Sequence, residues 1–294
     1  MQSFFSTRII AAILTVAVLG GGVFLWLNRV DKQSVEPAAT YDLKDVLIGK
    51  SVQGREIRAY TYGSGATHLL FVGGMHGGYE WNSVLLAYQF LDYLKANPDF
   101  ISKDLRVTII PDLNPDGVYR VIPGRTGGME GRFTINDVPK GDLSSGRFNA
   151  HHVDLNRNFD CKWKPESMWQ GKTVSAGTAA FSEPEAAALR HFVLTHTPSA
   201  AVFWHSQANA VYASECKDGI LSETLAIMNA YAKAANYPAV KSFDAYAISG
   251  DAEGWLASIN IPAITVELST HETVEWDKNL AGIKALFEYY DTEL

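Results

Sequence analysis

The sequence predicts an α/β fold, with a single domain built on a mixed parallel and antiparallel sheet that helices cover on both faces. Short apolar runs typical of buried strands alternate along the chain with longer runs of helical periodicity, and this alternation places helices on both faces of a sheet. Polar residues directly follow several of the apolar runs, and such positions mark the ligand crevice of α/β proteins. We expect a transmembrane helix to precede this domain.

The chain length and composition suit one globular domain. Of 294 residues, 47% are hydrophobic and 19% are charged, which is enough for one large domain or two small ones. We place one domain at residues 41–294 and expect it to be a monomer. The net charge of −7 and the absence of a basic block argue against a nucleic-acid partner.

The N-terminus has the features of a membrane segment. Residues 9–27 carry no charge, and at about 1.5 Å per residue they just span a bilayer core. We favour an uncleaved signal anchor at residues 1–30 over a cleaved signal peptide, which the glycines at 20–22 leave open. The alternative is a buried core helix, which the position at the terminus and the all-round hydrophobicity of the segment argue against. Residues 31–40 form a polar linker, and we expect the following domain to be periplasmic or extracellular.

The chain contains two cysteines, Cys161 and Cys216. Such a pair forms a disulfide in an oxidising compartment, and the alternative is two unrelated thiols. The membrane segment favours the bond.

The first half of the domain predicts three strands and a helix. Residues 55–62 alternate in polarity, as a half-buried strand does, whereas 68–72 and 105–110 are continuous apolar runs of buried strands. Residues 80–97 follow a helical period that ends at Pro98.

The middle of the chain begins with a turn at residues 114–117, which opens a long glycine-rich stretch to about residue 152. A loop of that length is usually functional or disordered. Ser182 and Glu185 have the spacing of a capping box, which predicts that a helix begins there.

The last third predicts two more strands and two more helices. Residues 200–204 and 261–268 are apolar runs typical of buried strands. Residues 221–237 are helical and stop at Pro238, and residues 279–290 form the final helix.

Three residues at predicted strand ends suit a metal ion. His76 and Glu80 lie where the strand at 68–72 turns into a helix, and His205 directly follows the strand at 200–204. A histidine beside glycines is more often a turn residue, and one at a strand end is more often structural. Together, two imidazoles and a carboxylate with an open position are the pattern of catalytic zinc. We expect one zinc ion per chain.

Three other residues suit the chemistry of such a site. Glu267 lies inside an apolar strand, so it is either an edge residue facing solvent or a general base beside activated water. Arg157, within residues 153–159, offers a two-pronged fork for a carboxylate, and the alternative is a surface salt bridge. Arg147 is a possible second anion binder.

These motifs together resemble the zinc carboxypeptidase family, in family order and over roughly residues 41–290. The matching segments are residues 74–81, 114–117, 147–150, 153–159, 205–206 and 266–268, with Tyr246, Gly250 and Trp255 matching the family's mobile tyrosine segment.

The resemblance implies a zinc-dependent carboxypeptidase that hydrolyses C-terminal peptide bonds with a zinc-activated water. His76, Glu80 and His205 would hold the zinc ion, and Arg147 would polarise the scissile carbonyl. The residues implied to grip the terminal carboxylate of the substrate are Asn156, Arg157 and Tyr246. Glu267 would take the proton from water and pass it to the leaving amine.

The chain departs from the family between the first two zinc ligands. The family has two residues there, whereas this chain has three, Gly77, Gly78 and Tyr79. Glycines absorb an extra residue because they adopt backbone angles that other residues avoid. Glu80 therefore stays assigned as a ligand, and its geometry is left open.

The resemblance also concerns substrate preference. The family position seven after the mobile tyrosine lines the side-chain pocket, and in this chain it is Glu253. An acid there implies a basic substrate side chain; the alternative is an acid in the first turn of a helix. The runner-up function is a peptidoglycan stem-peptide amidase acting at diaminopimelate. An inactive peptide- or wall-binding module is a third possibility, which the complete residue set argues against.

Overall fold

The computed structural model describes residues 43–125, 132–243 and 248–292. The expected membrane segment and linker, residues 1–40, lie outside the described residues, as does Tyr246. Membrane attachment therefore stays a prediction. Across the described ranges, no helix is both long and apolar enough to cross a membrane.

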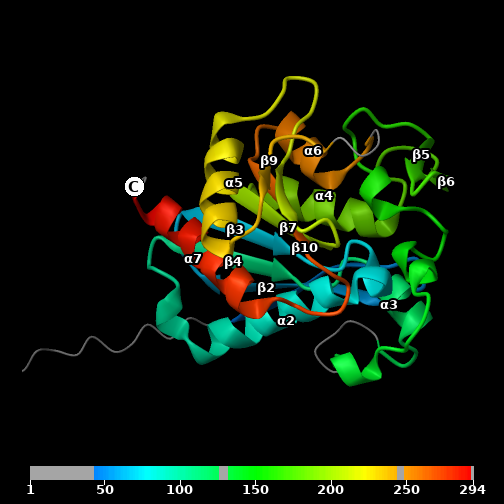
Figure 1. Cartoon of the computed structure of the whole chain (residues 1–294), viewed down its shortest axis with the longest axis horizontal. Helices are drawn as coiled ribbons and strands as arrows, with labels where there is room; N and C mark the ends of the chain where they lie inside the picture. Colours follow the sequence, from blue (N-terminus) through cyan, green and yellow to red (C-terminus); the bar gives the residue numbers. More distant parts are fainter. Residues whose placement is uncertain (1–42, 126–131, 244–247, 293–294) are drawn as a thin grey trace, which may run out of the picture. The chain divides into compact units, whose positions relative to one another are not determined.

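One eight-stranded sheet forms the centre of the unit Tyr41–Leu294 (Figure 1). Its strand order is β1-β2-β4-β3-β7-β10-β8-β9, with parallel pairs in the middle and antiparallel pairs at β1–β2, β2–β4 and β10–β8. This confirms the predicted mixed sheet. A separate hairpin pairs β5 with β6. The strands are β1 (Lys44–Lys50), β2 (Glu56–Gly63), β3 (Thr67–Val72), β4 (Leu105–Ile110), β5 (Glu166–Trp169), β6 (Lys172–Ser175), β7 (Ala200–Ser206), β8 (Ala210–Ala213), β9 (Ala239–Val240) and β10 (Ala263–Leu268).

Helices cover both faces of this sheet. Phe71 and Trp204 pack with α2, α5 and α7 on one face, whereas their strand neighbours Leu70 and Phe203 pack with α4 and α6 on the other. Neighbouring residues enter opposite cores because side chains alternate along a strand. The helices are α2 (Trp81–Ala96), α3 (Pro115–Val121), α4 (Pro184–His196), α5 (Ser222–Ala235), α6 (Ala252–Ser258) and α7 (Trp276–Thr292), with short 3₁₀ helices η1 (Gly77–Glu80), η2 (Pro98–Phe100), η4 (Ile135–Asp137), η5 (Ser144–Arg147) and η6 (Leu155–Arg157).

Two local predictions are wrong. Residues 114–117 are not an isolated turn: Asn114 accepts a hydrogen bond from the Gly117 backbone amide at 3.0 Å and caps α3, whose first residue is Pro115. The capping box at Ser182 does not form either, because α4 begins at Pro184. The predicted helices and the five predicted strands are otherwise confirmed within a few residues.

The arrangement of three neighbouring strands positions the candidate site. Strands β3, β7 and β10 lie side by side and run parallel, so their C-terminal ends meet at one edge of the sheet. His205 and Glu267 are direct partners in the ladder between β7 and β10, and His76 follows the end of β3 by four residues. The crevice expected from the sequence therefore lies at this edge.

Candidate metal centre and active site

The segment between His76 and Glu80 is a single turn of 3₁₀ helix, η1. Gly77 has a φ of +46°, and a Cβ atom on it would lie 2.8 Å from the Gly146 carbonyl oxygen, so this position requires glycine. The turn brings the Glu80 carboxylate back to 2.7 Å from His76 Nδ1. The extra residue in this motif is therefore accommodated without separating the two side chains.

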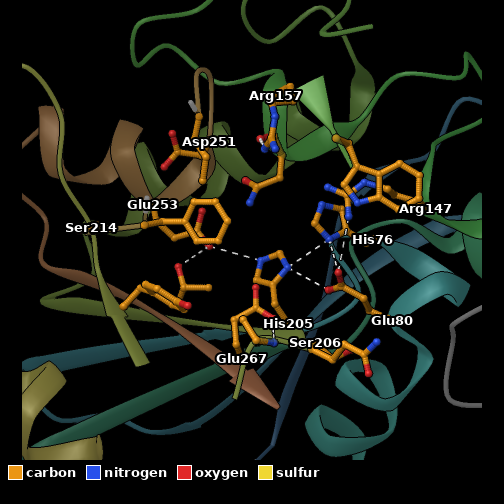
Figure 2. Close-up of a pocket in the computed structure, with 18 of the residues that line it drawn as sticks. His76, Glu80, Arg147, Arg157, His205, Ser206, Ser214, Asp251, Glu253 and Glu267 are labelled. Carbon is orange, nitrogen blue, oxygen red and sulfur yellow. Dashed lines mark hydrogen bonds and ion pairs between the residues drawn. The ribbon is translucent and has the colours of Figure 1, made fainter. Parts of the chain in front are cut away.

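His205, on β7, completes a cluster of three buried side chains with His76 and Glu80, which lie at the two ends of η1 (Figure 2). His205 Nδ1 lies 2.9 Å from Glu80 Oε2 and 3.2 Å from His76 Nδ1. One ligand atom from each residue lies within 4.8 Å of the others. All three residues are at most 4% exposed, so the cluster is shielded from bulk water.

This cluster fits a zinc ion. Tetrahedral zinc with Zn–N bonds of about 2.0–2.1 Å separates two nitrogen ligands by about 3.3 Å, and the two Nδ1 atoms are 3.2 Å apart. Two imidazoles and a carboxylate are also the donor set of known catalytic zinc sites. Burial would raise the pKa of Glu80, but His76 and His205 lower it further than burial raises it. The Glu80 carboxylate is therefore ionised, as a metal ligand must be.

The outer nitrogens of both histidines face carboxylates. His76 Nε2 lies 3.3 Å from Asp154 Oδ1, and His205 Nε2 lies 3.3 Å from Glu253 Oε1. A carboxylate in this position fixes the tautomer and the orientation of a ligand histidine. The pairing leaves Nδ1 of both rings directed at the centre of the cluster.

Arg147 connects this centre to the wall of the cleft. Its guanidinium contacts Asp154 at 2.8 Å and Glu80 at 3.6 Å, and it lies 4.7 Å from the ring centroid of Trp169. Burial would raise the pKa of Asp154, but Arg147 and Arg157 hold that pKa well below its usual range. Asp154 is therefore a charged partner for both Arg147 and His76.

Glu267 projects into the same cleft from β10, beside His205 (Figure 2). Its Oε2 atom accepts a hydrogen bond from the Ala208 backbone amide at 3.2 Å. Burial, followed by the negative charge of Glu80, raises the pKa of Glu267 to about 7. A carboxylate with a raised pKa is suited to accept and return a proton near neutral pH.

The cleft has a volume of about 540 Å³ and extends from the metal cluster to Asn156 and Arg157. Arg157 is 2% exposed and donates to the Asn156 carbonyl oxygen at 2.6 Å. The Asn156 side chain accepts from the Ala252 backbone amide at 2.9 Å. The structure thus places the guanidinium of Arg157 at the cleft, where a substrate anion can reach it.

Two acids line this part of the cleft, the buried Glu253 and the half-buried Asp251. Glu253 accepts a hydrogen bond from Thr265 at 3.0 Å in addition to its contact with His205. Asp251 Oδ2 accepts from the Gly254 backbone amide at 2.7 Å and caps α6. Burial, followed by the charge of Glu253, raises the pKa of Asp251 to about 6.

Cys161 and Cys216 are joined by a disulfide. Both cysteines lie in the hydrophobic core on the sheet face that α4 and α6 cover. Cys161 also lines the cleft. The bond connects the segment after Arg157 to the segment after β8, so it braces two walls of the cleft.

Sequence reasoning gave no role to two residues of the site, Asp154 beside the metal cluster and His271 in the cleft. Asp154 lies in the segment that contains Arg157, and an acid among arginine and asparagine was the available signal. His271 lies 2.6 Å from Ser206 Oγ and packs against Tyr79, the extra residue of the zinc motif, at 4.6 Å between ring centroids. No sequence pattern indicated His271, because its contacts come from two other segments.

Comparisons with known proteins agree with this site. The family model for zinc carboxypeptidases matches residues 41–280. The chain is 25% identical over 246 residues to gamma-D-glutamyl-L-diamino acid endopeptidase 1 of Lysinibacillus sphaericus, covering 78% of this chain and 61% of that protein. It is 32% identical over 146 residues to carboxypeptidase Z of Homo sapiens, covering 45% and 20%. The chain therefore spans less than two thirds of either relative.

The fold also matches a solved structure. Bovine thrombin-activatable fibrinolysis inhibitor, solved in complex with tick carboxypeptidase inhibitor, superposes with a TM-score of 0.68 at 16% identity, over 93% of this chain and 97% of that chain. At this identity the likeness concerns the fold alone. The family match covers most of the chain, and the chain therefore belongs to the zinc carboxypeptidase family.

Proposed function

We propose that this protein is an exopeptidase that removes the C-terminal residue of a peptide. The observation that carries the proposal is the presence, in one cleft, of a zinc-type ligand cluster, the carboxylate of Glu267 and the guanidinium of Arg157. An anion receptor beside the reacting centre selects the free carboxylate at the end of a chain.

Each residue has a distinct task in the proposed reaction. His76, Glu80 and His205 would hold zinc, which supplies a Lewis acid that acidifies water and polarises a carbonyl. Glu267 accepts a proton from the attacking water and passes it to the leaving amine. Arg147 faces the cleft beside Glu80 and stabilises negative charge that develops on the carbonyl oxygen.

The substrate's terminal carboxylate would be held at the other end of the cleft. Arg157 supplies the positive charge, and Asn156 lies beside it on η6. Tyr246 was predicted to join them, and its role stays a prediction because it lies outside the described residues.

A second candidate is an amidase or endopeptidase that cleaves beside a diamino acid such as diaminopimelate in a peptidoglycan stem peptide. The acids that line the cleft favour it: Glu253 is buried, Asp251 lies beside it, and a buried carboxylate needs a cationic partner. The Lysinibacillus relative is named for a γ-D-glutamyl-L-diamino acid bond. Selection of a basic side chain by Glu253 stays a prediction.

We also propose that the domain works outside the cytoplasm. The disulfide between Cys161 and Cys216 supports this location, because such bonds persist mainly in oxidising compartments.

Paired substrates test the exopeptidase proposal. The same peptide is offered with a free C-terminal carboxylate and with an amidated C-terminus. We expect release of one residue from the free acid and a kcat/KM lower by roughly 10- to 100-fold for the amide, since losing a charged hydrogen-bond partner costs about 1.5–3 kcal/mol. Equal cleavage of both would contradict the proposal.

A third substrate separates the two candidates. It carries a γ-D-glutamyl bond to diaminopimelate in place of the α-peptide bond to the last residue. Faster cleavage of this substrate than of any α-linked peptide, including one that ends in Lys, would establish the second candidate instead.

A further inference from the structure

The side chain of Glu253 lies against a metal ligand. Its Oε1 atom is 3.3 Å from His205 Nε2 and 3.0 Å from Thr265 Oγ1. Glu253 is 3% exposed and His205 is 2% exposed, so water does not compete for this contact. Figure 2 shows His205 between Glu253 on one side and Glu80 on the other.

The contact repeats the arrangement at the other histidine. His76 Nε2 also faces a buried carboxylate, Asp154, at 3.3 Å. In both cases Nδ1 points to the centre of the cluster and Nε2 points to the acid. Asp154, the N-cap of η6, supplies the carboxylate for His76, and Glu253 of α6 supplies the carboxylate for His205.

The backbone around Glu253 also holds the acid in place. Glu253 lies in the first turn of α6, whose N-cap is Asp251. The Asn156 side chain accepts from the Ala252 backbone amide at 2.9 Å and ties the start of this helix to η6. Glu253 therefore approaches His205 from a fixed support and does not depend on a substrate for its position.

We propose that Glu253 is a positioning residue for the zinc ligand His205. It accepts the Nε2 proton of His205, which fixes the tautomer that presents Nδ1 to the metal and increases the basicity of the ring. This role rests on the zinc site of the proposed function and is independent of which peptide is cleaved. It differs from the role in side-chain selection that the family resemblance implies for the same residue.

The test measures zinc affinity, without substrate. Zinc is removed from the purified full-length protein, and the dissociation constant is determined by competition with a chromogenic chelator. We expect Glu253→Ala to weaken zinc binding by roughly 10- to 100-fold, the range for partners of ligand histidines. Glu253→Gln should weaken it less, because its amide oxygen still accepts from Nε2.

Asp251→Asn is the matched control. Asp251 is a half-buried acid two residues away on the same cleft wall, and Glu253, not Asp251, faces His205. The control should bind zinc within about twofold of the parent, because the losses of roughly 10- to 100-fold concern partners of the ligand histidines, and the Asp251 carboxylate accepts from the Gly254 backbone amide instead. Equal weakening by Asp251→Asn and Glu253→Ala would mean that only the charge of the wall matters, and would overturn the proposal.

Folding is checked by circular dichroism and by the melting temperature of each zinc-free variant. If Glu253→Ala does not fold, Glu253→Gln decides: weaker zinc binding supports the proposal, and parental affinity overturns it. A folded Glu253→Ala that binds zinc like the parent also overturns it. Because no substrate is present, loss of the exopeptidase proposal would leave this result unchanged.

Discussion

A buried histidine lies near each end of strand β3, His68 within the strand and His76 four residues beyond it. The partners of the two rings differ. At the N-terminal end, His68 Nε2 lies 2.8 Å from Thr108 Oγ1, and Nδ1 lies 3.4 Å from the His196 carbonyl oxygen. Beyond the C-terminal end, His76 faces the carboxylates of Glu80 and Asp154. The hydrogen-bond partners of the His68 ring are neutral, whereas the His76 ring contacts two carboxylates.

This difference shows that burial alone does not make a histidine functional. Burial, with the charge of Arg106 as the second cause, lowers the pKa of His68 to about 4, so that ring stays neutral. Burial would also lower the pKa of His205, but Glu80 and Glu253 raise it well above its usual range. Converging carboxylates, and not the strand end, distinguish a metal site from a structural histidine.

The largest effect is expected when the metal ligand beyond the C-terminal end of β3 is removed. His76→Ala should weaken zinc binding by roughly 100-fold or more, because structural zinc sites derive about 3 kcal/mol from each ligand, and activity should be lost with the metal. The matched control is His68→Gln at the other end of β3, which should keep stoichiometric zinc. Elemental analysis after dialysis measures both variants, and full zinc in His76→Ala would remove this residue from the ligand set.

The next largest effect distinguishes the role of Glu267 as a base from the role of the metal ligands at the same edge of the sheet. Glu267→Gln should retain zinc but lose turnover by about 10²- to 10⁴-fold, since only the proton acceptor is removed. Zinc content and kcat are measured on the same preparation. Turnover equal to that of the parent would show that Glu267 is structural.

The smallest effect concerns His68, at the N-terminal end of β3, and the dependence of stability on pH. The folded pKa of His68, about 4, lies below the unfolded value of about 6.5. The unfolded chain therefore binds more protons between these values, so stability contributed by neutral His68 is present above pH about 6.5 and is lost as pH falls toward about 4. The loss is about 3 kcal/mol.

His68→Gln isolates this contribution, because Gln cannot titrate and its amide can still reach Thr108. Denaturant unfolding of both proteins across this pH range should show the free energy of unfolding falling more steeply for the parent. Parallel pH profiles would mean that folding does not shift the pKa of His68.

The sequence was sufficient for five strands and four helices, but it did not indicate the seven-residue β1. Strands such as β4 and β10 were recognised as continuous apolar runs, and helices such as α2 and α5 contain enough residues for a helical period to be recognised. The two residues of β9 and the four residues of β8 contain no usable period. These short strands exist because neighbouring strands pair with them, and that is tertiary information.

The candidate site divides in the same way. Residue type and strand position were enough to propose His76, Glu80, His205 and Glu267. The contacts of Asp154 and Glu253 with the two rings depend on the positions of η6 and α6 in space. The sequence showed both acids, but it could not show which group each one faces.

The long separation between the two histidines has a consequence for the order of folding and metal uptake. His76 and His205 are 129 residues apart in sequence, and only the pairing of β3 with β7 brings them together. Closing so long a loop costs entropy before the metal can contribute any binding energy. We therefore expect zinc to bind only after β3 and β7 have paired, in contrast to a zinc finger, whose folding depends on the metal.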